Sequence, residues 1–106
     1  MRKPRRQGTQ NVVVDLGLAD AGELSAKATL AMKVNALLKS RDLTQAKAAM
    51  LLGMPQAKVS AIRNYKLQGI SLARLMHALT VLGQHVQIVV RPSKGRKTIA
   101  RIDVAA

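Results

Sequence analysis

The segment Gln45–Asn64, QAKAAMLLGMPQAKVSAIRN, has the clearest pattern of residues with a chemical role. It matches the helix-turn-helix pattern, in which the second of two crossed helices enters the major groove of DNA. Ala49 is small where the helices cross, and Gly53 can adopt the left-handed backbone of the turn. The positions that satisfy the pattern in one register are Ala49, Gly53, Met54, Val59 and Ile62. A buried helical hairpin with no role on DNA is the alternative.

The outward face of the second helix in this segment is expected to meet base edges. Gln56 can form two hydrogen bonds with adenine, and Ala57 or Ala61 can contact the methyl group of thymine. The predicted base-reading residues are Gln56, Ala57, Ser60 and Ala61, with Lys58 and Asn64 nearby. For each of them the alternative is a solvated surface side chain.

Phosphate contacts are predicted around the same segment. Gln45 opens the first helix, where side chains and backbone amides commonly meet phosphate. Four long cations are placed to border the groove: Arg41, Lys47, Arg63 and Lys66. A solvated surface position is the alternative for each of these cations as well.

Catalytic and metal-binding patterns are missing from the sequence. His77 and His85 are the two histidines, and the five carboxylates are scattered, so neither a metal-ligand cluster nor an acid–base pair is formed. We therefore expect no enzymatic activity, no cofactor and no metal.

Charge identifies the class of partner. The 106 residues include 18 Lys and Arg against 5 Asp and Glu, a formal net charge of +13. Such a charge on a small protein predicts a polyanionic partner: nucleic acid, an anionic membrane or an acidic protein. The chain has no cysteine, no apolar stretch of about 20 residues and no apolar export segment, so we expect a cytoplasmic protein with no membrane partner.

The elements around the motif follow from apolar periodicity. They predict a mainly α fold, a four-helix helix-turn-helix domain followed by a short C-terminal β-hairpin. The predicted helices cover residues 22–41, 45–52, 55–63 and 72–82, and the predicted strands cover 85–91 and 98–104. Thr44 and Ser71 are predicted to begin helices, and Gly53 and Gly83 to end them.

The first predicted helix has an apolar stripe along one side. Its members are Leu24, Ala31, Val34 and Leu38, with Leu30 and Leu37 widening it. Three lysines are predicted to lie largely off this stripe: Lys27, Lys33 and Lys39.

Three regions are predicted along the chain: a basic disordered arm (1–11), the DNA-binding domain (12–83) and C-terminal strands (84–106) that form a candidate dimerisation element. The arm carries Arg2, Lys3, Arg5 and Arg6. These cations either lie along DNA phosphates or enter a minor groove, or they belong to a disordered solubilising tail.

The stretch Asp15–Pro92 resembles the Xre (Cro/C1-type) helix-turn-helix regulators, and more narrowly the HigA-like antitoxins. Three blocks carry the resemblance: LTQAKAAMLLGMPQAKVS, ISLARLMHALTVLG and HVQIVV. The resemblance implies a λ-repressor-like fold, a homodimer on a palindromic operator of double-stranded DNA, autoregulation of the promoter, and neutralisation of a small basic RelE-like ribonuclease toxin. Two features depart from the family: Tyr65-Lys66 replaces a Gly-Arg-type loop, and the basic arm is longer.

Two other functions are compatible with the residues. One is a stand-alone transcriptional regulator with no toxin partner. The other is an RNA-binding accessory protein, which is disfavoured because such modules usually stack bases on aromatic side chains and Tyr65 is the one aromatic residue.

The surfaces for protein partners are also predicted. A dimer is expected through the C-terminal region, with or without the fourth predicted helix, because the strand Val86–Val90 offers an apolar face and an edge. The toxin is expected to contact residues 12–31, whose acids are Asp15, Asp20 and Glu23, with the C-terminal hairpin as second choice. A local role for Glu23, near a helix start, is the alternative to a toxin contact.

Overall fold

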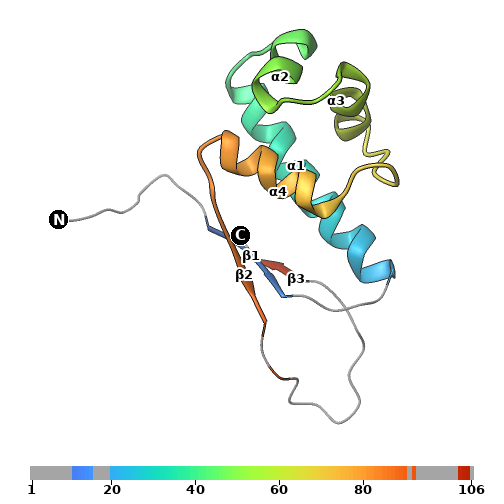
Figure 1. The fold of residues 1–106 in the computed structure, drawn as a ribbon, viewed down its shortest axis with the longest axis vertical. Helices are drawn as coiled ribbons and strands as arrows, with labels where there is room; N and C mark the ends of the chain where they lie inside the picture. Colours follow the sequence, from blue (N-terminus) through green and yellow to red (C-terminus); the bar gives the residue numbers. More distant parts are fainter. Residues whose placement is uncertain (1–10, 16–19, 91, 93–102, 106) are drawn as a thin grey trace, which may run out of the picture.

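Four helices and three short strands form the part of the chain that the computed structural model describes, which is residues 11–15, 20–90, 92 and 103–105. The elements are β1 (Asn11–Asp15), α1 (Asp20–Ser40), α2 (Gln45–Leu52), α3 (Gln56–Arg63), α4 (Leu72–Val81), β2 (His85–Val89) and β3 (Asp103–Ala105). The predicted four-helix, mainly helical architecture is confirmed (Figure 1). The basic arm before Asn11 and the start of the predicted strand 98–104 lie outside the described residues.

The helix boundaries follow from capping chemistry. The Thr44 hydroxyl accepts a hydrogen bond from the Lys47 amide at 3.2 Å, and the Ser71 hydroxyl accepts one from the Arg74 amide at 3.0 Å. Each bond satisfies an amide that has no partner inside its own helix. Gly53 ends α2 with φ 65°, in the left-handed region. The caps predicted at these positions are therefore confirmed.

The core is aliphatic and receives side chains from all four helices. Its fully buried larger members are Leu30, Val34, Leu38, Leu52, Val59, Ile62, Ile70, Leu75, Leu79 and Leu82. The predicted stripe on α1 needs one correction, because Leu24 is 47% exposed and Lys27 is buried. Position 27 precedes Leu30 and Ala31 by three and four residues, so it lies on their face of the helix.

The strands form one sheet in the order β2-β1-β3. Strand β1 pairs in parallel with β2, Val12 opposite Val86, and antiparallel with β3, Val14 opposite Val104. The predicted C-terminal hairpin is therefore wrong, because β2 and β3 do not pair with each other. The unbroken run Val12–Val14 is of the β-branched type common in central strands, and it occupies the place between them.

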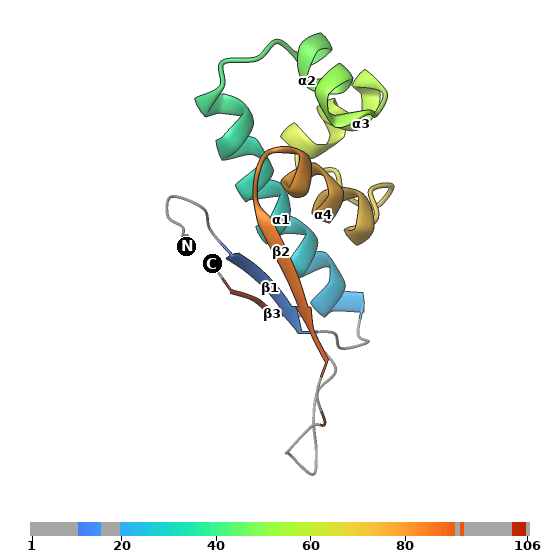
Figure 2. The same ribbon diagram turned by 60° about the vertical axis from the view of Figure 1, so that its left-hand side comes forward.

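The helix-turn-helix and the sheet lie at opposite ends of the molecule. Helix α1 extends from α2 and α3 at one end to the sheet at the other, and α4 lies alongside it (Figures 1 and 2). Strand β3 contacts α1, and β2 contacts α4. The sheet therefore packs against α1 and α4, at the end of the molecule away from α2 and α3.

Replacing Gly53 by alanine tests the turn. A Cβ at Gly53 would meet no atom within 4 Å, so the cost arises from the left-handed backbone alone. We expect Gly53→Ala to lower the free energy of unfolding by about 1–2 kcal/mol in chemical denaturation. Gly69→Ala is the matched control: its nearest atom would be Lys58 Nζ at 3.8 Å and its φ is not left-handed. Equal losses in both variants would contradict the assignment.

Candidate nucleic-acid interface

Helices α2 and α3 are held at their crossing by small and apolar residues. Ala49 is 7% exposed, Met54 is 6% exposed and Val59 is fully buried. The Met54 amide donates to the Ala49 carbonyl at 3.1 Å, which closes the turn after α2. The motif positions predicted from spacing therefore occupy the predicted environments.

The outward face of α3 is uneven in its exposure. Gln56, Ala57 and Asn64 are exposed, whereas Ser60 and Ala61 are half-buried and Ala61 packs against the core. The Asn64 amide group donates to the Ser60 carbonyl at 2.9 Å and lies 3.4 Å from its hydroxyl. The face most open to a ligand is thus the N-terminal part of α3, together with Asn64 after its last residue.

Two glutamines link the starts of the two helices. Gln45 Nε2 donates to the backbone carbonyl of Gln56 at 3.3 Å, and the Gln56 side chain is exposed. Since α3 begins at Gln56, this bond fixes the entry of α3 relative to α2. The structure therefore brings together two residues that the sequence assigned separately to phosphate and base contacts.

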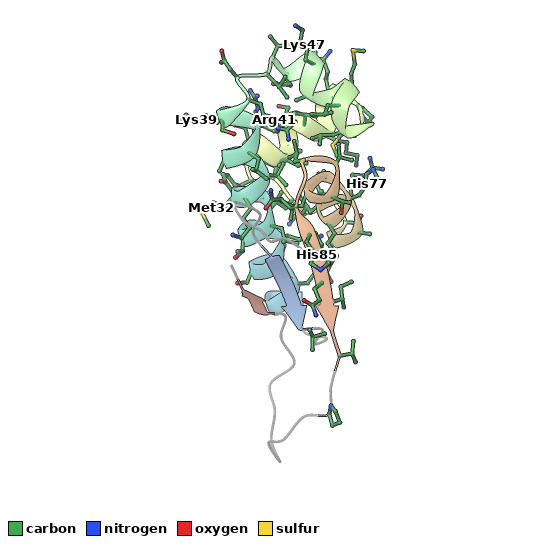
Figure 3. The ribbon with its side chains drawn as sticks, turned by 90° about the vertical axis from the view of Figure 1, so that its left-hand side faces the viewer. Met32, Lys39, Arg41, Lys47, His77 and His85 are labelled. Atoms are coloured by element: carbon green, nitrogen blue, oxygen red, sulfur yellow. The ribbon has the colours of Figure 1, made fainter. Side chains whose placement is uncertain are left out.

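Some of the predicted cations are exposed, and others donate hydrogen bonds to backbone carbonyls. Lys47 and Lys66 are exposed, and Figure 3 shows Lys47 at the end of the molecule that α2 forms. Lys58 Nζ donates to the Gly69 carbonyl at 2.8 Å, and Arg63 Nη2 donates to the Leu43 carbonyl at 3.3 Å. The Arg41 guanidinium is bonded at the end of α4 instead, where its Nη2 donates to the Leu82 carbonyl at 3.2 Å.

Carboxylates are absent from the stretch of sequence that carries Lys47, Lys58, Arg63 and Lys66. Residues 43–102 contain no Asp or Glu, and α2, α3 and α4 lie inside that interval. Lys58 and Arg63 bond to backbone carbonyls, which carry no net charge. The excess of positive charge in this stretch attracts an anion.

Met50 is a surface residue that sequence reasoning missed. Its side chain is 83% exposed and borders a shallow groove whose other lining residues are Ala46, Ala49, Gly53, Met54, Pro55 and Gln56. Methionine is a common filler of hydrophobic cores, so its residue type does not indicate a surface position. Position 50 falls off the buried stripe Ala48, Ala49 and Leu52, and that offset is the signal that could have found it.

The described residues hold no group of three or more His, Cys, Asp or Glu side chains that could bind a metal. His77 and His85 are both exposed and stand on different elements, α4 and β2 (Figure 3). No helix in the described part of the chain is long and apolar enough to cross a membrane.

Comparison with known proteins agrees with this geometry. A family model described as a helix-turn-helix domain matches residues 12–91. A solved structure described as an XRE family transcriptional regulator superposes with a TM-score of 0.72 and 48% sequence identity, covering 83% of this chain and 99% of its own. No curated protein matches the sequence.

Proposed function

Because this chain belongs to the XRE-type helix-turn-helix family of DNA-binding transcriptional regulators, we propose that it represses its own promoter and acts as the antitoxin of a toxin–antitoxin operon. Its partner would be a small basic RelE-like ribonuclease toxin. The alternative within the same family is a stand-alone regulator with no toxin partner. Either function is non-enzymatic, as is general for regulators of this family.

The observation that carries the DNA-binding part is the exposed start of α3 in a region without carboxylates. Helices of this type present their N-terminal side chains to base edges. We assign base reading to Gln56 and Ala57, with Ser60, Ala61 and Asn64 beside them. Gln45, Lys47 and Lys66 would contact phosphates, while Lys58 and Arg63 would add charge from their bonded positions.

Substitution of Gln56 and Lys66 separates the two kinds of contact. Gln56→Ala should weaken binding to the specific site by about 1–3 kcal/mol and relax base preference, because a bidentate contact is lost. Lys66→Ala should weaken all sequences alike and reduce the salt dependence by roughly one unit of slope. Binding-site selection and salt titration measure these effects. An unchanged preference in Gln56→Ala would refute the proposed register of α3.

A homodimer on a palindromic site is the second part of the proposal. One helix-turn-helix reads few bases, so two copies are needed for selectivity. Within the described residues β2 pairs on one edge only, with β1. Ile88 is 50% exposed and Val90 is 74% exposed, on the side of β2 where Val86 packs against the core. An unpaired strand edge next to an exposed apolar face favours pairing with a second copy of the chain.

A charge placed on either face of β2 tests this interface. Ile88→Asp should give a monomer in sedimentation at micromolar concentration, because it puts a carboxylate into the apolar contact. Gln87→Asp adds the same charge at the neighbouring exposed position, on the opposite face, and should remain dimeric. Dimers of equal stability in both variants would place the interface elsewhere.

The toxin contact is proposed on α1. Of the predicted segment 12–31, β1 is paired along both edges, and Glu23 lies in the first turn of α1 and pairs with Lys27 at 3.4 Å. Among the described residues, a row of exposed apolar side chains four positions apart follows on α1: Leu24 and Ala28 lie within the segment, and Met32 lies one residue beyond it. Figure 3 shows Met32 projecting from α1. This row is an accessible apolar surface for a protein partner.

Co-purification with the product of the neighbouring gene tests the antitoxin proposal. The full chain should retain that protein, and the double substitution Leu24→Ala/Met32→Ala should weaken its binding about tenfold or more, because buried apolar anchors dominate such interfaces. Met50→Ala removes a still more exposed apolar side chain from α2 and should have no effect. If the chain fails to bind the product, and the product alone is harmless to cells, the protein is a stand-alone regulator.

A further inference from the structure

Lys27 is a buried lysine on the core side of α1. The residue is 6% exposed, and its ammonium donates to the Leu67 carbonyl at 3.2 Å and lies 3.4 Å from a Glu23 carboxylate oxygen. A buried ammonium is tolerated only when it has partners of this kind. Glu23 is half-exposed and lies on the same helix as Lys27. The bond that connects Lys27 to another part of the fold is therefore the one to Leu67, 40 residues away in the sequence.

The Leu67 carbonyl belongs to the loop that follows α3. Leu67 and Ile70 anchor this loop in the core at 5% and 1% exposure, and Lys66, directly before Leu67, is exposed. A second ammonium, that of Lys58 on α3, bonds the Gly69 carbonyl at 2.8 Å. Two carbonyls of one loop are therefore held by lysines from two different helices.

We propose that Lys27 is a positioning residue for DNA binding, which holds the loop after α3 so that Lys66 faces a phosphate. Lys27 is too deeply buried to touch DNA itself. Its effect on binding would arise because a loop already fixed in its bound conformation loses less conformational freedom on association. The proposal rests on the phosphate contact proposed for Lys66.

The loop geometry explains why an anchor on Lys27 would matter for Lys66. Tyr65 has a left-handed backbone with φ 57°, a conformation unfavourable for a residue with a side chain. The Lys66 amide donates to the Ala61 carbonyl at 2.8 Å, one residue before the carbonyl that Lys27 holds. Without the ammonium, the Leu67 carbonyl would keep only the Ile70 amide, which donates to it at 3.1 Å from within the loop, and the segment after the strained turn at Tyr65 would lose its bond to α1.

A double-mutant cycle on operator affinity tests the proposal. Lys27→Met removes the ammonium and keeps most of the buried stem. We expect it to weaken binding about three- to tenfold and to lower the salt slope by roughly one, as Lys66→Ala does. In the Lys66→Ala background it should then add nothing, because the contact it positions is gone. Lys39→Met, an exposed lysine of the same helix, is the control for loss of one charge.

The proposal would be overturned if the losses of operator affinity caused by Lys27→Met and Lys66→Ala added fully in folded protein. It would also be overturned if Lys27→Met weakened operator binding no more than Lys39→Met does. A purely structural role for Lys27 predicts such additivity. Lys27→Arg, which keeps a cation and a donor, should restore most of the affinity. If Lys27→Met is too unstable to study, Lys27→Gln replaces it in the same cycle.

Amide hydrogen exchange gives a readout that does not depend on DNA. The amides of Lys66 and Ile70 are bonded within the loop, to Ala61 and Leu67 respectively. Lys27→Met should speed their exchange about tenfold relative to the Leu79 amide, since one hydrogen bond to a charged group is lost. Unchanged loop exchange refutes the role of Lys27. Faster loop exchange without any effect of Lys66→Ala on affinity refutes the phosphate contact instead.

Discussion

Hydrogen bonds from cationic side chains to backbone carbonyls are the interaction on which this structure depends. Lys27, Lys58 and Arg63 each reach a carbonyl in a loop, and Arg41 reaches the carbonyl at the end of α4. Carbonyls at helix ends and in loops have no partner within a helix, and the negative end of the helix dipole favours a cation there. In a chain with five carboxylates, these carbonyls supply the partners that acids supply elsewhere.

The use of carbonyls as hydrogen-bond partners of the cations links the fold to the function. A carboxylate would cancel the charge of the cation that it holds, whereas a carbonyl fixes the cation and leaves its charge in place. Lys58 and Arg63, which bond to carbonyls in the interval with no acid, therefore keep their positive charge for attracting DNA, whereas Lys27 is paired with Glu23. Association with a polyanion is promoted, and the side chains around α3 lose little freedom when it occurs.

The sheet has a separate role at the far end of α1. Strand β1 joins β2 and β3, so the segments before and after the four helices are bound to each other as well as to the helices. Within the described residues this arrangement uses both edges of β1 and pairs β2 along one edge. The partner surfaces proposed on β2 and α1 lie away from α2 and α3, so a protein bound there would leave the proposed DNA-binding helices accessible.

The sequence by itself determined the four helices, their caps at Thr44 and Ser71, and the left-handed turn at Gly53, because each depends on residues within one or two turns of the chain. It also determined the inner face of α3, since helical spacing separates Val59 and Ile62 from Gln56 and Ala57. Only the tertiary structure decided the pairing of β1 with β2, the bond of Lys27 to the Leu67 carbonyl and the exposure of Leu24. A strand's partner and a helix's covered face depend on segments distant in sequence, and local spacing carries no information about which segment arrives there.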